Sequence, residues 1–140
     1  MAKTTELEAA YRATTYRVFL PAGLCELRLD QQSETLRNWL ETDGAESFAI
    51  LTAHNPDAKQ FDQATNMVRQ SQMEIELLEA GHEPYAGENE ADSGDWPAEE
   101  TCFVANISLP SAREIGAKYG QNAIVHGLAD GIPRLVWIEQ

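Results

Sequence analysis

Polar residues stand at the end of an apolar run near the middle of the chain. Thr52 lies near the end of the run 47–53, and His54 and Asn55 follow the run directly before Pro56. The end of a buried strand before a helix is where α/β sheets bind ligands. Thr52 and Asn55 can hydrogen bond a ligand, and His54 can transfer a proton near neutral pH. Asn-Pro is also a turn signal, and a purely structural role for Asn55 stays open.

Three further polar residues are candidates for the same ligand site. Asn66 and Arg69 are three residues apart in a predicted helix and therefore neighbours on its surface. Arg69 can bind a carboxylate or phosphate with two parallel hydrogen bonds, and a structural ion pair is the alternative. Gln121 follows Gly120, where its amide either ties a helix end to a strand or contacts a ligand.

Trp96, Glu99 and Glu100 form the last group of candidates. Two carboxylates can do acid–base chemistry when burial raises the pKa of one of them. Neighbouring residues on a strand point to opposite faces, however, so Glu99 and Glu100 are not expected to act together. Trp96 either anchors the preceding segment or stacks on a planar ligand. The ligand-binding candidates are thus Thr52, His54, Asn55, Asn66, Arg69, Trp96, Glu99 and Gln121.

The sequence contains no recognisable catalytic signature. His54, His82 and His126 do not have the spacing of a helical metal motif, and we expect no metal and no cofactor. A glycine-rich phosphate loop and a Gly-x-Ser-x-Gly motif are both missing from the sequence. Catalytic residues therefore stay unknown, and whether the protein is an enzyme stays open.

Length and charge restrict the class of protein. The 140 residues carry 23 acids and 10 bases, a net charge of −13, which disfavours nucleic acid and anionic membranes. The length suits one domain over residues 1–140. The N-terminus lacks the apolar core of a signal peptide, so a cytoplasmic location is expected. Cys25 and Cys102 each lie in an apolar run and should be buried free thiols.

The pattern of apolar and turn residues predicts six strands and four helices. Pro21 to Gly23 separate the first two strands as a hairpin, and Asp130-Gly131 is the turn of a final hairpin. Ser33 is a good first cap of a helix that Gly44 ends. The predicted helices are 5–13, 33–44, 60–80 and 110–120, and the predicted strands are 16–20, 24–29, 47–53, 101–107, and the pair 123–128 and 132–138.

Two segments have unusual patterns. Residues 86–98 are acidic, contain glycine and lack large apolar groups before Trp96, which predicts a mobile surface loop. The helix over 60–80 has apolar residues on two sides, with Phe61, Val68 and Ile75 on one and Met73 on the other. Such a helix packs on both sides or forms an interface.

The order of elements favours an α+β fold. Hairpins at both ends indicate antiparallel pairing, so we expect a single mixed or antiparallel sheet with helices packed mainly on one face. Helices on both faces are the main alternative.

Several short motifs, taken in order, resemble the DUF3293 family, a bacterial domain of unknown function. The resemblance rests on the segments 52–56, 96–100 and 119–125, together with Asn66 and Arg69. It would extend over roughly Tyr11 to Val136 and implies a compact bacterial domain. It implies no reaction, substrate or catalytic residue.

Three functional hypotheses follow from these observations. The first is a small binding or interaction module with a protein partner, including a second copy of the chain as a homodimer. The second is a small-molecule-binding protein or enzyme with a polar pocket around Thr52 to Asn55, Arg69 and Gln121. The third, a nucleic-acid mimic, ranks last because most acids fall in a predicted loop and on helix exteriors.

Overall fold

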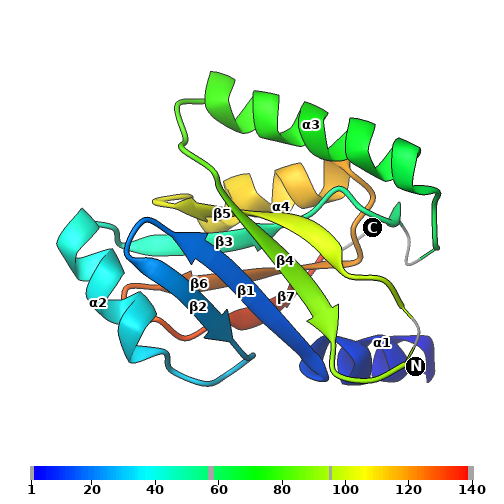
Figure 1. Ribbon diagram of the computed structural model, residues 1–140, viewed down its shortest axis with the longest axis horizontal. Helices are drawn as coiled ribbons and strands as arrows, with labels where there is room; N and C mark the ends of the chain where they lie inside the picture. The colour runs from blue at the N-terminus through cyan, green and yellow to red at the C-terminus, as the bar shows by residue number, and fades with distance from the viewer. Residues whose placement is uncertain (1, 57–58, 95, 139–140) are drawn as a thin grey trace.

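Seven strands form one sheet in the computed structural model, which describes residues 2–56, 59–94 and 96–138. Their order is β2-β1-β4-β5-β3-β6-β7, and every neighbouring pair is antiparallel (Figure 1). The predicted hairpins are both present, as β1 with β2 and β6 with β7. The strands are β1 (Thr14–Leu20), β2 (Gly23–Leu27), β3 (Ser47–Leu51), β4 (Tyr85–Ala91), β5 (Glu99–Ala105), β6 (Ala123–Leu128) and β7 (Arg134–Trp137).

Four helices accompany the sheet: α1 (Ala2–Arg12), α2 (Glu34–Asp43), α3 (Gln63–Glu79) and α4 (Leu109–Lys118). Ser33 caps α2 by accepting a hydrogen bond from the Leu36 N–H, and Gly44 ends this helix in the left-handed conformation at φ 71°. Helix α1 begins at Ala2, three residues before the predicted start. The α+β class and the single sheet are confirmed.

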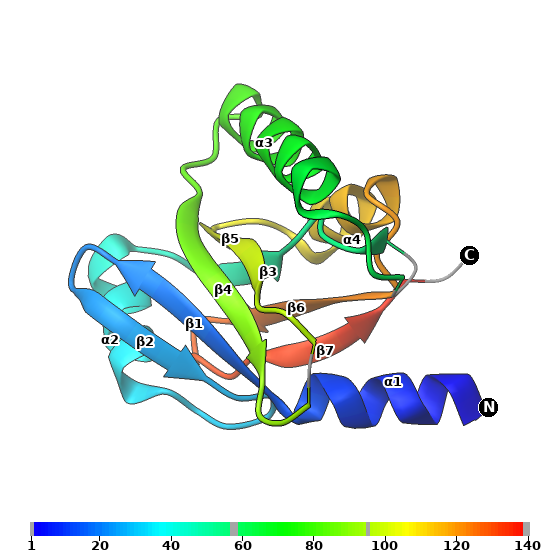
Figure 2. The ribbon, with the colours of Figure 1, turned by 45° about the vertical axis from the view of Figure 1, so that its right-hand side comes forward.

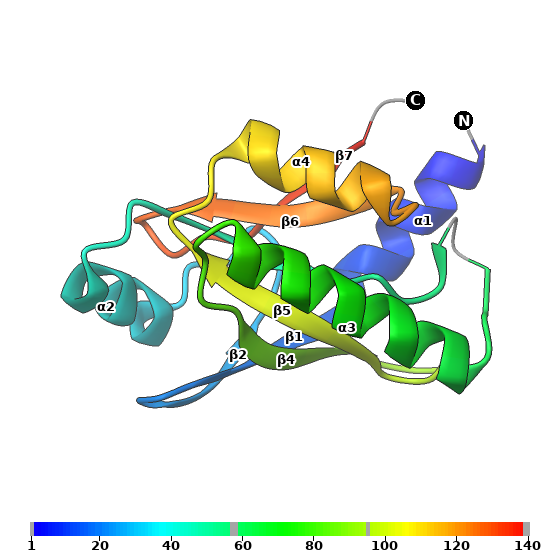
Figure 3. The ribbon, with the colours of Figure 1, turned by 90° about the horizontal axis from the view of Figure 1, so that it is seen from above.

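Strand β3 separates two hydrophobic cores. Ala49 and Leu51 belong to the core under α3 and α4, which cover one face of the sheet (Figures 1 and 3). Phe48 and Ile50 point the other way, and Phe48 stacks on Phe103 with ring centroids 5.6 Å apart. The strand is therefore buried on both faces, as its apolar run predicts.

The other face of the sheet carries the second group of helices. Leu36 and Leu40 of α2 are fully buried in the core of that face, together with Tyr16 and Val18 of β1. Helix α1 lies at the end of the sheet and extends past β7 (Figure 2). Its Tyr11 ring meets Trp137 edge-on at 5.9 Å between centroids. Two helices thus share one face, and the other two lie on the opposite face and at the end of the sheet.

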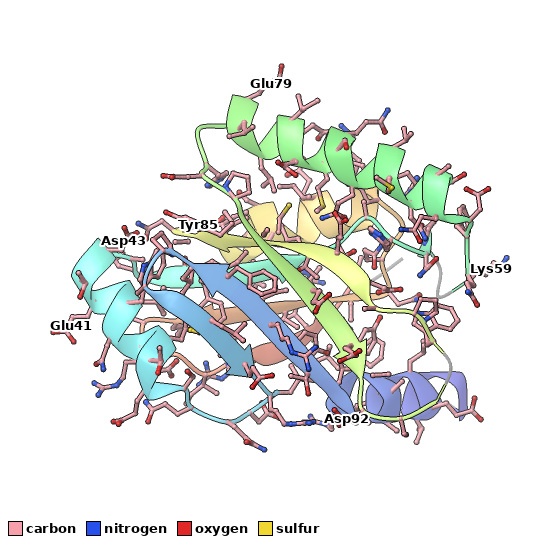
Figure 4. The ribbon with its side chains drawn as sticks, viewed as in Figure 1. Glu41, Asp43, Lys59, Glu79, Tyr85 and Asp92 are labelled. Carbon is pink, nitrogen blue, oxygen red and sulfur yellow. The ribbon has the colours of Figure 1, made fainter. Side chains whose placement is uncertain are left out.

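The prediction of a loop over 86–98 is wrong for residues 86–91, which belong to strand β4. Figure 4 labels Tyr85 at the start of this strand and Asp92 just past its end. Glu88 and Glu90 face solvent, where Arg17 of β1 reaches both carboxylates at 3.6 and 2.8 Å. The inward positions are Gly87, Asn89 and Ala91, which are small or polar. Without a bulky apolar residue on its inward side, the segment has the composition of a loop.

The two cysteines lie on opposite faces of the sheet. Cys25 belongs to the core beside α2, and Cys102 belongs to the core under α3 and α4. Both are buried and free, as the sequence predicts. Burial raises the pKa of the Cys102 thiol to about 12, which keeps it protonated and unreactive. Over the described ranges, no helix has both the length and the apolar character needed to cross a bilayer.

Candidate functional site

A cavity of about 600 Å³ opens at the end of the sheet where α1 enters β1. Its apolar wall comes from α1, β1, β3, β6 and β7, and small side chains leave the space that larger ones would fill. The main apolar residues of the wall are Leu7, Tyr16, Ile50, Ile124, Val125 and Leu135.

Polar residues line the remaining part of the cavity. Six of the eight candidates predicted from the sequence are there: Thr52, His54, Asn55, Trp96, Glu99 and Gln121. They come from three places in the fold, which are the end of β3, the start of β5 and the segment before β6. Asn66 and Arg69 of α3 are not part of this lining.

Glu99 is held in one orientation by two donors. The Asn55 side-chain amide donates to Glu99 Oε2 at 2.5 Å, and the Trp96 indole N–H donates to the same oxygen at 3.0 Å. Glu99 is the first residue of β5 and is half-buried, whereas Glu100 is exposed on the other side of the strand. The two carboxylates therefore do not face each other, as the strand geometry predicts.

Asn55 is the central residue of a small hydrogen-bond network. It has a left-handed backbone with φ 47°, which asparagine tolerates better than most residues. Its Oδ1 accepts from the Phe61 N–H at 2.8 Å and from Asn66 Nδ2 at 2.9 Å. Asn55 thus has the structural role that the sequence left open, since it shapes the turn, and it also holds Glu99 at the cavity; a contact of Asn55 with a ligand stays a prediction.

Arg69 connects two main-chain segments through hydrogen bonds to their carbonyls. Its Nε donates to the Ala53 carbonyl at 3.1 Å, and its guanidinium donates to the Tyr119 carbonyl at 2.6 Å. The guanidinium also lies over the Tyr119 ring, 5.6 Å from its centroid. These contacts differ from both predicted roles, a ligand clamp and an ion pair. Arg69 joins the end of β3 to the end of α4.

Two glutamines hold the segment after β3 in a similar way. Gln121 Nε2 donates to the His54 carbonyl at 3.0 Å, which ties the end of α4 to this segment as one of the predicted alternatives states. Gln70 Oε1 accepts from the Ala53 N–H at 2.9 Å. Gln70 is 3% exposed and was missed from the sequence, although it follows Asn66 by one helical turn on the same buried face.

Asn89 is a second residue that the sequence analysis missed. It lies on β4, directly opposite Tyr16 of β1 and Glu99 of β5 in the strand register, and it lines the cavity. Its Oδ1 is buried, and no donor to it is found within the described part of the chain. The alternation of Glu88, Asn89 and Glu90 was the signal for a strand with one inward polar residue.

Two tyrosines complete the polar side of the cavity. Burial, followed by the nearby Glu99 carboxylate, raises the pKa of Tyr11 to about 12. Burial also raises the pKa of Tyr16, whose hydroxyl donates to the Tyr11 carbonyl at 2.9 Å. Both phenols are therefore neutral at physiological pH. Across residues 2–56, 59–94 and 96–138, no three His, Cys, Asp or Glu side chains come together as a metal site.

The fold and the site define an α+β protein with an apolar cavity at one end of an antiparallel sheet and a polar cluster around Glu99. The family model for DUF3293, described as a protein of unknown function, matches residues 51–124. The chain belongs to this family, and the match is narrower than the expected Tyr11 to Val136. Comparison with curated proteins and with solved structures finds no match.

The matched range contains most of the polar cluster. It runs from the last residue of β3 to the second residue of β6 and includes all eight candidate residues. The wall formed by α1 and β1, with Tyr11 and Tyr16, lies outside it.

Proposed function

We propose that this protein binds a small organic molecule in the cavity between α1, β4 and the start of β6. The cavity volume of about 600 Å³ lies within the range of roughly 300–1,000 Å³ that is usual for small-molecule sites. Mostly apolar walls with a few converging polar groups are also typical of such sites. The oriented Glu99 carboxylate supplies one fixed polar contact.

The observation that carries the proposal is the oriented Glu99 carboxylate in the wall of the cavity, and the side chain of Asn89 supports it. A buried amide oxygen without a partner costs about 1–3 kcal/mol, so native proteins rarely keep one without a reason. Asn89 keeps such an oxygen on a strand whose neighbouring inward positions are Gly87 and Ala91. A turn of this side chain toward the cavity would bring the oxygen to an occupant that donates a hydrogen bond.

A thermal-shift screen with a cavity-filling variant tests the proposal. Ala91 lines the cavity, and Ala91→Leu adds three carbon atoms inside it. Ala86→Leu adds the same atoms on the outward side of the same strand and is the matched control. The library should contain neutral, cationic and anionic small molecules, since a ligand that binds only the folded state raises its melting temperature.

We expect ligands that raise the melting temperature of the wild type and of Ala86→Leu but not that of Ala91→Leu. A library without any stabilising member would refute the proposal. Equal shifts in the wild type and in Ala91→Leu would place the binding elsewhere and would refute it as well.

A second candidate function is attachment to another protein through the outer side of α3. Val68, Ile75 and Leu78 are 60%, 54% and 55% exposed, whereas Met73 and Leu77 of the same helix are fully buried. An apolar stripe on the solvent side of a helix favours an interface, either with a different protein or with a second copy. Sedimentation of the wild type and of Ile75→Lys at rising concentration tests the homodimer. A wild type that stays monomeric throughout excludes that form of the proposal.

A further inference from the structure

The side chains that line the cavity carry little formal charge. Among the described lining residues, Glu99 is the only acid, and neither lysine nor arginine occurs. Arg69, the anion-binding candidate of the sequence, is not part of the lining and is bound to the Ala53 and Tyr119 carbonyls instead. An anionic ligand would therefore meet a carboxylate and no counter-charge, which is unfavourable in a partly buried site.

Glu99 presents its second oxygen as a fixed acceptor. Both donors, Asn55 and Trp96, bind Oε2, and no donor to Oε1 is found among residues 2–56, 59–94 and 96–138. Asn55 is itself held by Asn66 and by the Phe61 N–H, so the carboxylate is oriented before a ligand arrives. A preorganised acceptor loses little entropy on binding.

A second acceptor lies beside the first. Asn89 is directly opposite Glu99 in the register of β4 and β5, and such pairs have Cβ atoms roughly 4.5–5.5 Å apart. Its buried, unpartnered Oδ1 needs a donor. A group with several N–H donors, such as an ammonium, can bind the carboxylate and, once the Asn89 side chain turns toward the cavity, the amide oxygen as well.

Aromatic rings surround these acceptors. Tyr11, Tyr16 and Trp96 all line the cavity, and Trp96 is bound to Glu99 itself. Aromatic faces attract organic cations, and the attraction grows when the cation is desolvated. The rest of the wall is aliphatic, with Ile50 and Val125 among its residues, and suits an apolar body attached to the cationic group.

Resting on the small-molecule site proposed above, we infer that the ligand is an organic amine. Its ammonium group binds Glu99 Oε1, its apolar body lies against the aliphatic wall, and a turn of the Asn89 side chain toward the cavity adds Oδ1 as a second acceptor. The net charge of −13 favours the approach of such a cation over long range.

Three probes of nearly equal size test the charge of the ligand. Phenethylamine, phenethyl alcohol and phenylacetate all carry a phenyl ring on a short chain and differ in a cationic, neutral or anionic head. Their affinities for the full chain are measured by calorimetry or by ligand-observed NMR. The amine should bind at least about tenfold tighter than the alcohol, because a charged hydrogen bond contributes about 1.5–3 kcal/mol, and phenylacetate should bind weakest.

A matched pair of variants assigns the effect to Glu99. Glu99→Gln and Glu100→Gln remove the same charge from neighbouring residues, but only Glu99 lines the cavity. Glu99→Gln should lower the affinity for phenethylamine to the level of the alcohol, whereas Glu100→Gln should leave it within about twofold, the remainder being long-range charge. Circular dichroism confirms that each variant is folded.

The outcomes separate this inference from the proposed function. If the alcohol or phenylacetate binds as tightly as the amine, and Ala91→Leu abolishes that binding, the cavity binds small molecules but the preference for a cation is wrong. Equal losses in Glu99→Gln and Glu100→Gln would also overturn the inference. If library ligands bind but none of the three probes does, the inference fails alone. If neither library nor probes bind, both proposals fail.

Discussion

Asn66 holds Asn55 by two hydrogen bonds at once. Asn66 Oδ1 accepts from the Asn55 N–H at 2.9 Å, and Asn66 Nδ2 donates to Asn55 Oδ1 at the same distance. Both residues are buried, at 6% exposure each. This pair fixes the turn after β3 to the first part of α3, and through Asn55 it also orients Glu99.

Asn66→Ala should therefore lower both stability and the order of the site. It leaves the buried Asn55 N–H without its acceptor, and the free energy of unfolding should fall by roughly 2–3 kcal/mol in urea denaturation. Gln72→Ala, which removes an exposed amide from the same helix, should change it by less than about 0.5 kcal/mol. Equal effects of the two variants would contradict the structural role of the pair.

Because Arg69 binds two main-chain carbonyls, we expect it to contribute to stability and not to ligand binding. Arg69→Ala removes both hydrogen bonds to main-chain carbonyls, and unfolding should become easier by about 1.5–3 kcal/mol. Arg69→Lys should restore only a part of this, because lysine lacks the planar group that reaches two carbonyls and stacks on Tyr119.

Ligand affinity is the second measurement on Arg69. At a temperature where both variants are fully folded, the affinity of any cavity ligand should stay within about twofold of the wild type. A much larger loss would show that Arg69 contacts the ligand, as the sequence alone indicated.

Gly87 lies on β4 between β1 and β5, with no room for a side chain. A Cβ atom there would lie 2.4 Å from the Arg17 carbonyl oxygen and 2.7 Å from Thr101 Oγ1. Gly87→Ala should cost about 1–3 kcal/mol of stability, because the main chain of β1 must shift. Ala86→Ser, a small change on the exposed side of the same strand, is the control for urea denaturation. A stable Gly87→Ala variant would show that the strands can separate without loss.

The ion pair of Asp92 with Arg28 makes the free energy of unfolding depend on pH. Arg28 donates to both Asp92 oxygens at 2.7 and 2.8 Å, and this contact holds the pKa of Asp92 below its ordinary value. Since the folded pKa is the lower one, the unfolded chain binds the proton first. The stabilisation is therefore present above about pH 4 and is lost as the pH falls through the lowered pKa.

Denaturation midpoints at pH 7 and near pH 3 measure this effect. Asp92→Asn should be less stable than the wild type at neutral pH, and the difference should shrink in acid. Glu41→Gln, on the exposed side of α2, should follow the wild type at both pH values. A constant difference between Asp92→Asn and the wild type would show that the Arg28 contact contributes nothing through charge.

Local patterns allowed most of the fold to be predicted. The strand around Phe48 to Leu51 is a continuous apolar run, and the final hairpin follows from Asp130-Gly131, so both depend on neighbouring residues only. Strand β4 was missed because its pairing depends on residues that are distant in the sequence. Arg17 and Glu90, which bind each other across β1 and β4, are 73 positions apart.

The polar residues of the site were found more easily than their roles. A sequence shows that Asn55, Arg69 and Gln121 are polar residues near expected strand or helix ends, but it does not show which group each one binds. Arg69 and Gln121 both bind Tyr119 O, which the fold brings to them from the end of α4. Asn89 became visible only once β4 placed it opposite Glu99.

The inward residues of β4 also have a consequence for how this fold can diversify. Main-chain hydrogen bonds to β1 and β5 hold the strand in register, and these do not depend on which side chains stand at 89 and 91. Exchanges at these two positions would resize the cavity and leave the backbone unchanged. Under the small-molecule function proposed above, related chains with bulkier residues there would bind smaller ligands, so ligand size and folding could evolve separately in this architecture.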